Sequence, residues 1–185
     1  LKQFNEDIDD VISRALSVGV HRFYMPSINS SYNKDMLQLM SRYPENIFCM
    51  IGLHPCYVDE DYKKELDFVR EEIKKNKYYA IGEIGIDLYH EKKFLKEQII
   101  AFEEQIDLAI RYDLPIVIHC RESFNEIYDV LKKFKSKNLR GIFHCFSGSI
   151  EEANKIVDLN FSLGIGGVVT FKNGGIDKII DQINI

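Results

Sequence analysis

The chain of 185 residues is 45% hydrophobic and 29% charged, which suits one ordinary globular domain over residues 1–185. Its formal net charge of -5 argues against a broad basic face for nonspecific nucleic-acid binding, although a site that binds phosphate through divalent metals needs few basic residues. No apolar stretch is long enough to span a membrane and no secretion signal is visible, so we expect no membrane association.

Short β-branched apolar segments alternate with longer amphipathic segments along the chain. The predicted strands are Val20–Met25, Ile47–Leu53, Tyr79–Ile86, Ile116–Cys120, Gly141–Phe146 and Phe161–Ile165. The predicted helices are Asn5–Ser17, Asn33–Arg42, Tyr62–Lys75, Phe94–Arg111, Ser123–Phe134, Ile150–Leu159 and Ile176–Ile183. The segment Ser149-Ile150-Glu151-Glu152 fits a capping box at the start of the sixth helix.

Repeated strand–helix units predict an α/β fold with a parallel sheet and right-handed crossovers. An open doubly wound sheet or a closed barrel would satisfy this order, but no strand is followed by the glycine-rich fingerprint of dinucleotide-binding folds. A (β/α)8 barrel needs eight strands, and the sequence offers six and begins with a helix. We therefore expect a strand before Asn5 and another after Ile185 to be absent from this sequence.

Polar residues interrupt the predicted strands near their C-terminal ends. His54, His119 and His144 each follow or end an apolar run, and Glu83 and Asp87 lie on the strand between the first two histidines. In a βα barrel all strand C-termini open on one face, where active sites are built, so these residues should converge.

Imidazole and carboxylate groups are ligands for Zn²⁺, Mn²⁺ or iron, and carboxylates also suit Mg²⁺. Two such ions close together can activate a water molecule and stabilise a phosphoryl leaving group. A single strand-end histidine is usually structural, and Glu83 alone could pair with a buried cation, but the set on successive strands favours a metal site. His21 begins a strand, which places it at the opposite end, and His90 lies in a charged loop, so both are left out of the site.

The four cysteines form no C-x-x-C pair, which argues against a zinc ribbon or a thioredoxin-like motif. Each lies in or beside an apolar run, so we interpret them as reduced thiols of a cytoplasmic protein. They are Cys49, Cys56, Cys120 and Cys145.

Four segments together resemble, in order and spacing, the signature segments of the TatD family of metal-dependent deoxyribonucleases. They are Gly52-Leu53-His54-Pro55, Gly82-Glu83-Ile84-Gly85-Ile86-Asp87, Ile118-His119-Cys120-Arg121 and His144-Cys145-Phe146-Ser147-Gly148. The resemblance covers nearly the whole chain and implies a (β/α)8 barrel of the TIM type. It also implies a deoxyribonuclease, often a 3′-to-5′ exonuclease, that uses two divalent ions, Mg²⁺ or Mn²⁺ in function and often zinc in crystals.

The same resemblance assigns a role to each site residue. Glu83 would bridge the two metals and, with His54, take part in catalysis by metal-activated water. His119 and His144 would ligate one metal, and Asp87 would orient groups at the rim. The substrate would be a single strand or a 3′ end of DNA, and the protein would act as a monomer. The residues that would bind the substrate phosphate are His54, Arg121, Ser147 and Gly148.

The family also has a His-x-His pair on its first strand and an aspartate on its last, and neither occurs in this sequence. Their expected positions precede Leu1 and follow Ile185. Two other functions stay open: a related barrel hydrolase acting on an amide or ester of a small molecule, and a non-catalytic paralogue without metal. Glu83, rather than a carbamylated lysine on that strand, argues against the first.

Overall fold

The computed structural model describes residues 4, 6–90 and 92–183, and within them helices and strands alternate as predicted. The helices are α1 (Ile8–Ser17), α2 (Ser30–Arg42), α3 (Tyr62–Glu72), α4 (Leu95–Arg111), α5 (Phe124–Lys133), α6 (Ile150–Asp158) and α7 (Ile176–Ile180). The strands are β1 (Phe23–Met25), β2 (Ile47–Cys49), β3 (Ile81–Asp87), β4 (Ile116–Arg121), β5 (Gly141–Phe143) and β6 (Ser162–Leu163). Two 3-10 helices, η2 (Pro55–Tyr57) and η3 (Gly167–Thr170), were not predicted.

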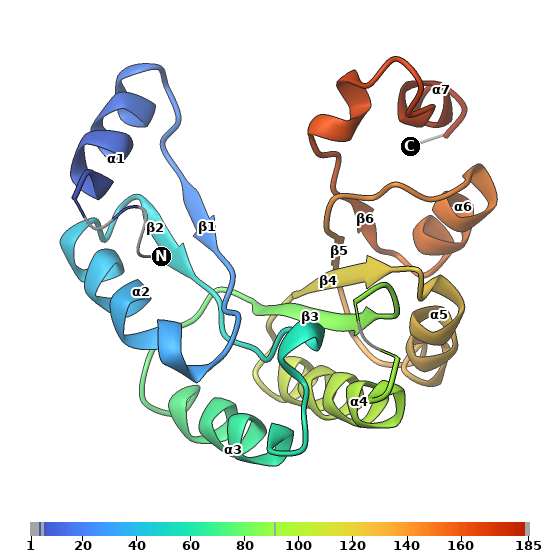
Figure 1. Ribbon diagram of the computed structural model, residues 1–185, viewed down its shortest axis with the longest axis horizontal. Helices are drawn as coiled ribbons and strands as arrows, with labels where there is room; N and C mark the ends of the chain where they lie inside the picture. Colours follow the sequence, from blue (N-terminus) through green and yellow to red (C-terminus); the bar gives the residue numbers. More distant parts are fainter. Residues whose placement is uncertain (1–3, 5, 91, 184–185) are drawn as a thin grey trace.

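Every strand pairing among the described residues is parallel, which confirms the predicted α/β class. β1 pairs with β2, and β3, β4, β5 and β6 form a second sheet in chain order. An isolated parallel bridge between Ile51 and Ile81 joins the segment after β2 to β3. The six strands thus follow one another along an arc, as Figure 1 shows.

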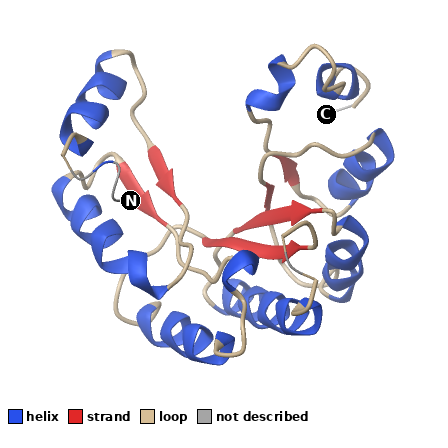
Figure 2. Cartoon of the chain, in the orientation of Figure 1, coloured by secondary structure: helices blue, strands red, loops and turns tan. Residues whose placement is uncertain are grey.

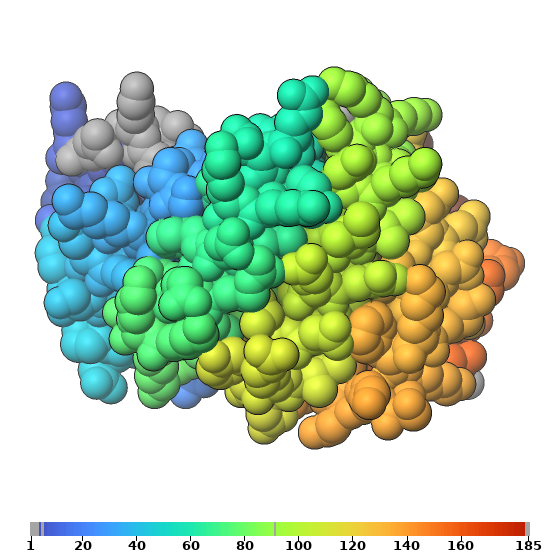
Figure 3. Space-filling view, turned by 90° about the horizontal axis from the view of Figure 1, so that it is seen from below, coloured from blue at the N-terminus to red at the C-terminus, as the bar shows by residue number. Residues whose placement is uncertain are grey.

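Helices α1 to α6 lie on the outer side of this arc and the strands on its inner side (Figure 2). In the space-filling view, the consecutive segments lie side by side and make a continuous outer surface (Figure 3). One apolar cluster of buried side chains, none more than 8% exposed, extends from Ile12 on α1 to Phe161 before β6 and includes Phe102, Ile106 and Ile118. Burial of these side chains against the strands is the main force that holds the helices in place.

The element boundaries differ from the predicted ones mainly at strand ends. β5 ends at Phe143, so His144 lies in the loop after this strand rather than on it, and β2 ends at Cys49, so His54 lies further beyond its strand than predicted. The expected start of the first helix, Asn5, lies outside the described residues. The capping box is confirmed, since the Ser149 side chain accepts from Glu152 N while the Glu152 side chain accepts from Ser149 N. Within the described part of the chain, no helix combines the length and apolar character needed to cross a membrane.

Candidate metal-dependent active site

Strand β3 places its acidic side chains by simple alternation. Successive side chains of a strand point to opposite faces, so Glu83, Gly85 and Asp87 share one face while Ile84 and Ile86 share the other. The two isoleucines are fully buried at 0% exposure. The carboxylates therefore face the inside of the arc because the apolar face of the strand is required by the core.

His119 reaches both of these carboxylates from the neighbouring strand. It pairs in register with Gly85, so its ring stands between Glu83 and Asp87. Its Nδ1 lies 3.1 Å from Glu83 Oε1 and its Nε2 lies 2.8 Å from Asp87 Oδ2. The convergence of β3 and β4 that the sequence predicts is confirmed for these three residues.

The contacts shift the pKa values of all three groups. Burial lowers the pKa of His119, but its hydrogen bonds to Glu83 and Asp87 outweigh burial and raise it above 6.5. Burial also works to raise the pKa of Glu83, yet the hydrogen bond with His119 and the charges of His144 and His54 lower it. Asp87 follows the same rule, because bonds from His90 and His119 override burial and lower its pKa. The contacts therefore favour a protonated His119 between the ionised carboxylates of Glu83 and Asp87.

Asp87, which the resemblance expects to orient groups at the rim, is buried and bonded at both of its carboxylate oxygens. Its side chain is only 1% exposed, and its Oδ1 accepts hydrogen bonds from the backbone N–H groups of Tyr89 and His90. With Oδ2 facing His119, the carboxylate is held at both oxygens. A carboxylate held in this way can orient the ring of His119.

His54 stands in the loop between β2 and η2 and faces Glu83. Its backbone N–H donates to Ile28 O, and its Nδ1 accepts a hydrogen bond from Cys56 N at 3.2 Å. Its Nε2 is then left 4.0 Å from Glu83 Oε1, and its ring centroid lies 4.4 Å from that of His119. Burial, reinforced by the His119 charge, lowers the pKa of His54 to about 4. The ring is thus neutral near pH 7, and because Nδ1 accepts from Cys56 N, its one proton is on Nε2, the nitrogen that faces Glu83.

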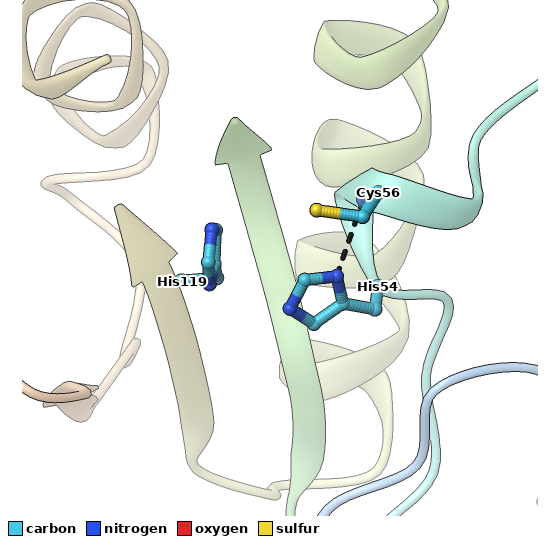
Figure 4. Close-up of side chains that lie close together, drawn as sticks. All are labelled: His54, Cys56 and His119. Atoms are coloured by element: carbon cyan, nitrogen blue, oxygen red, sulfur yellow. Dashed lines mark hydrogen bonds between the residues drawn. The ribbon is translucent and has the colours of Figure 1, made fainter. Parts of the chain in front are cut away.

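Cys56, which the sequence pattern suggested to be only a reduced thiol, also lies at this site. Ligand atoms of His54, Cys56 and His119 all lie within 4.8 Å of one another, close enough to hold a metal ion. His54 and Cys56 extend from the η2 segment and His119 from β4, with β3 between them in the view (Figure 4). The available signal was the position of Cys56 two residues after His54, on a turn that begins with proline.

Of the remaining predicted site residues, His144 and Arg121 act electrostatically on Glu83 and Cys56 respectively, whereas no contact among the described residues joins Ser147 or Gly148 to this centre. His144 is exposed, and its charge acts on Glu83 while its Nε2 lies 3.3 Å from Cys145 Sγ. The Arg121 guanidinium stacks over the Tyr89 ring at 3.8 Å. Ser147 is exposed, and Gly148 packs so closely on the Glu152 side chain that an added Cβ would lie 2.2 Å from its Oε2.

The exclusion of His90 from the neighbourhood of the site is wrong. Its side chain is 51% exposed, but its Nδ1 lies 3.0 Å from Asp87 Oδ2. The turn after β3, closed by the Asp87 carboxylate, brings the ring back to the site. His21 is exposed and precedes β1, so it remains at the opposite end of its strand.

The site opens toward a cavity of about 1390 Å³ that His54, Cys56 and Glu83 help to line. Its other walls are mostly apolar side chains of α1, α2 and β1, such as Ile8, Phe23 and Met36. A ligand in this cavity would reach the polar residues at one end while contacting an apolar surface elsewhere.

The donor set fits divalent cations. Glu83 is a carboxylate with 12% side-chain exposure whose Oε1 lies within 4.0 Å of ring nitrogens of both His54 and His119. A carboxylate buried to this degree needs a cationic partner, which the protonated ring of His119 supplies in this structure. A metal ion could take the place of that proton. Carboxylate and imidazole together suit Mn²⁺ and Zn²⁺, and the carboxylates suit Mg²⁺.

Comparison with known proteins gives a consistent result. The sequence model of a family described as TatD related DNase matches residues 1–184. The chain is 33% identical over 172 residues to the uncharacterized metal-dependent hydrolase YabD of Bacillus subtilis, covering 93% of this chain and 67% of that protein. It is 30% identical over 174 residues to the 3'-5' ssDNA/RNA exonuclease TatD of Pantoea ananatis, covering 94% and 67% respectively.

A solved structure resembles the fold closely. The crystal structure of the TatD homolog YJJV from Escherichia coli superimposes with a TM-score of 0.89 at 27% identity, over 98% of this chain and 70% of that one. The arc of parallel strands is therefore of the TIM-barrel type, as predicted. The chain spans about two thirds of the length of the relatives it matches.

Proposed function

Since the chain belongs to the TatD-related DNase family of metal-dependent hydrolases, we propose that it hydrolyses phosphodiester bonds of DNA and shortens single strands from the 3′ end. The observation that carries this proposal is the contact of Glu83 and Asp87 with the two ring nitrogens of His119, with His54 at 4.0 Å from the same Glu83 oxygen. The relative from Pantoea ananatis is named a 3'-5' ssDNA/RNA exonuclease, which supports the substrate class.

The proposed cofactors are two divalent ions, Mg²⁺ or Mn²⁺, held by Glu83, His119 and His144. Such ions would supply an activated water and positive charge to the phosphoryl oxygens. Glu83 Oε1 faces the imidazoles of both His54 and His119. The carboxylate is therefore placed where two metal ions could share it. Asp87 fixes the orientation of the His119 ring through its Nε2, 2.8 Å away.

The remaining site residues are proposed to handle substrate. His54 is neutral near pH 7, and because its Nδ1 accepts from Cys56 N, its Nε2 carries the ring proton and can donate a hydrogen bond to a substrate phosphate at the face of Glu83. Arg121 offers a planar guanidinium that can bind a phosphate with two hydrogen bonds. Ser147 and Gly148 precede α6 and would contact a phosphate through their backbone N–H groups. We propose that one chain acts as a monomer, since all these residues come from it.

We further propose that the protein works in the cytoplasm. All four cysteines are free, and Cys56 and Cys145 are exposed, which suits a reducing compartment.

The test is hydrolysis of a 5′-labelled DNA oligonucleotide by the full-length protein with Mg²⁺, with Mn²⁺ and with EDTA. We expect stepwise shortening that EDTA abolishes. Glu83→Gln should reduce the rate at least about a hundredfold, since even outer partners of metal ligands cost 10–100-fold. The matched control is Glu104→Gln, because Glu104 pairs with Arg70 on the outer helices and should keep full activity.

Two results would overturn the proposal. Full activity in Glu83→Gln would remove the carboxylate from the mechanism. Absence of cleavage by a protein that has bound its metal would exclude DNA as the substrate and favour a small-molecule ester or amide.

A further inference from the structure

Three side chains of different chemistry meet beside the proposed catalytic residues. Cys56 belongs to η2, Asp87 ends β3, and His90 follows in the next turn. Cys56 Sγ lies 3.4 Å from Asp87 Oδ2 and 3.7 Å from His90 Nδ1, and these two atoms lie 3.0 Å from each other. A sulfur, a nitrogen and an oxygen thus form a triangle with sides of 3.0–3.7 Å.

The triangle has the size of one face of a tetrahedral zinc site. With the usual zinc bond lengths, sulfur, nitrogen and oxygen ligands of a tetrahedral ion lie about 3.4–3.6 Å apart. The three distances here bracket that range, so an ion could bind with shifts of a few tenths of an ångström. Asp87 Oδ2 already faces Cys56 Sγ and His90 Nδ1. A cation could therefore take the place of the protons between these atoms with little movement of the side chains.

Contacts outside the triangle hold its members in place. Asp87 Oδ1 accepts from the N–H groups of Tyr89 and His90, which leaves Oδ2 directed at Cys56, His90 and His119. Cys56 N donates to His54 Nδ1, which fixes the start of η2. Fixed outer contacts of this kind orient metal ligands in known sites. Cys56 and His90 are both exposed, so an ion can enter from solvent and keep a fourth position for water.

We propose that Cys56, Asp87 and His90 form a separate binding site for one thiophilic divalent cation of the zinc class. The thiolate is a soft ligand that selects Zn²⁺ over Mg²⁺ and Mn²⁺, whereas the proposed catalytic set of Glu83, His119 and His144 contains no sulfur. Binding releases the Cys56 thiol proton to solvent. The site shares Asp87 Oδ2 with His119, so an ion bound there would compete with His119 for that oxygen.

Cobalt is the probe, because Co²⁺ replaces zinc in tetrahedral sites and a thiolate ligand gives a sulfur-to-cobalt absorption in the near ultraviolet. The full-length protein is titrated with Co²⁺ in the presence of excess Mg²⁺. We expect the sulfur absorption to saturate at one ion per chain. Zn²⁺ should displace the cobalt and abolish the absorption, and Mg²⁺ should not.

Variants assign the ligands without reference to DNA cleavage, so this test can fail or succeed independently of the proposed nuclease function. Cys56→Ser should lose the absorption, and His90→Gln should weaken Co²⁺ binding at least about tenfold. The matched control is Cys145→Ser, because Cys145 is also exposed and lies 3.3 Å from a histidine nitrogen, and it should bind cobalt normally. Circular dichroism of each variant verifies that it is folded.

Three results would overturn the proposal. The first is no sulfur absorption in the unaltered protein. The second is an absorption that survives in Cys56→Ser or disappears in Cys145→Ser. The third is equal cobalt affinity in His90→Gln, which would place the ion on His54, Cys56 and His119 instead.

Discussion

The side-chain amide of Gln105 holds both backbone polar groups of Leu53, the residue before His54. Gln105 Oε1 accepts from Leu53 N at 2.6 Å, and its Nε2 donates to Leu53 O at 3.3 Å. Gln105 is only 1% exposed although it lies on the apolar side of α4. The core therefore keeps a polar side chain at this point, where it fixes the loop that carries His54.

Replacing Gln105 by leucine should destabilise the fold and displace His54. The substitution leaves the buried N–H and C=O of Leu53 without partners, at a cost of about 1–3 kcal/mol for each unsatisfied group. We expect a lower urea midpoint and a changed chemical shift of the His54 ring. Gln98→Leu is a comparison for stability alone: Gln98 makes the same pair of bonds to the backbone of Asp87, so that variant should lose a similar amount of stability. Unaltered stability in Gln105→Leu would contradict this account.

The pKa values of His54 and His119 should be shifted in opposite directions in the metal-free protein. Burial lowers the pKa of His54 to about 4, while hydrogen bonds to Glu83 and Asp87 outweigh burial and raise that of His119 above 6.5. NMR titration of the ring signals in EDTA, assigned with His54→Asn and His119→Asn, measures both values. Two similar values near 6.5 would mean that the carboxylates do not face His119 in solution.

The two shifts have opposite effects on stability. The raised pKa of His119 gives a contribution that is fully present below pH 6.5 and is lost as the pH rises through the folded-state value. The lowered pKa of His54 gives a contribution that is present above pH 6.5 and is lost as the pH falls toward about 4. Urea unfolding in EDTA should therefore show that His119→Asn lowers stability more at pH 5.5 than at pH 9.

Gly85→Ala should be among the most damaging small substitutions in the chain. Gly85 has a φ of +141°, and a Cβ there would lie 2.1 Å from His119 O on the paired strand. The strands would have to separate where His119 meets the carboxylates, so strain of order 1–3 kcal/mol adds to the packing that is lost. Thermal unfolding compares it with Gly19→Ala, since Gly19 also has a positive φ but nothing within 4 Å of its Cβ position. Equal losses in the two variants would show that the strand contact is unimportant.

The sequence predicted the parts of the site that follow from regular structure. Glu83, Asp87 and His119 lie on strands, and alternation together with parallel pairing brings their side chains to one face. The capping box at Ser149 is similarly local, because the residues that form it are three apart. In each case the spacing of the residues in the sequence matches the repeat of the strand or helix that carries them.

The parts that were missed depend on loops and on contacts between distant segments. His90 returns to the site because the Asp87 carboxylate binds two backbone N–H groups of the following turn, and charge alone suggested a solvated loop. Cys56 reaches Asp87 across 31 positions of sequence. β5 ends at Phe143, and two residues later Cys145 adopts a φ of +47°, a conformation that no residue-type preference for cysteine indicates. The hydrophobic periodicity of the sequence does not indicate loop conformations or contacts between distant segments.

Arg121 lies with its guanidinium 3.8 Å from the centroid of the Tyr89 ring, which should hold it ready for a substrate phosphate. Tyr89 is 56% exposed, and a cation–π contact at an exposed site is worth about 0.5–1 kcal/mol. Tyr89→Leu should therefore raise the KM for an oligonucleotide about two- to fivefold with little change in kcat, since that energy corresponds to this ratio. Tyr89→Phe keeps the aromatic face and should behave like the unaltered protein. A fall in kcat with unchanged KM in Tyr89→Leu would mean that the ring acts on the reacting groups, and equal loss in both variants would assign the effect to the hydroxyl rather than to its support of Arg121.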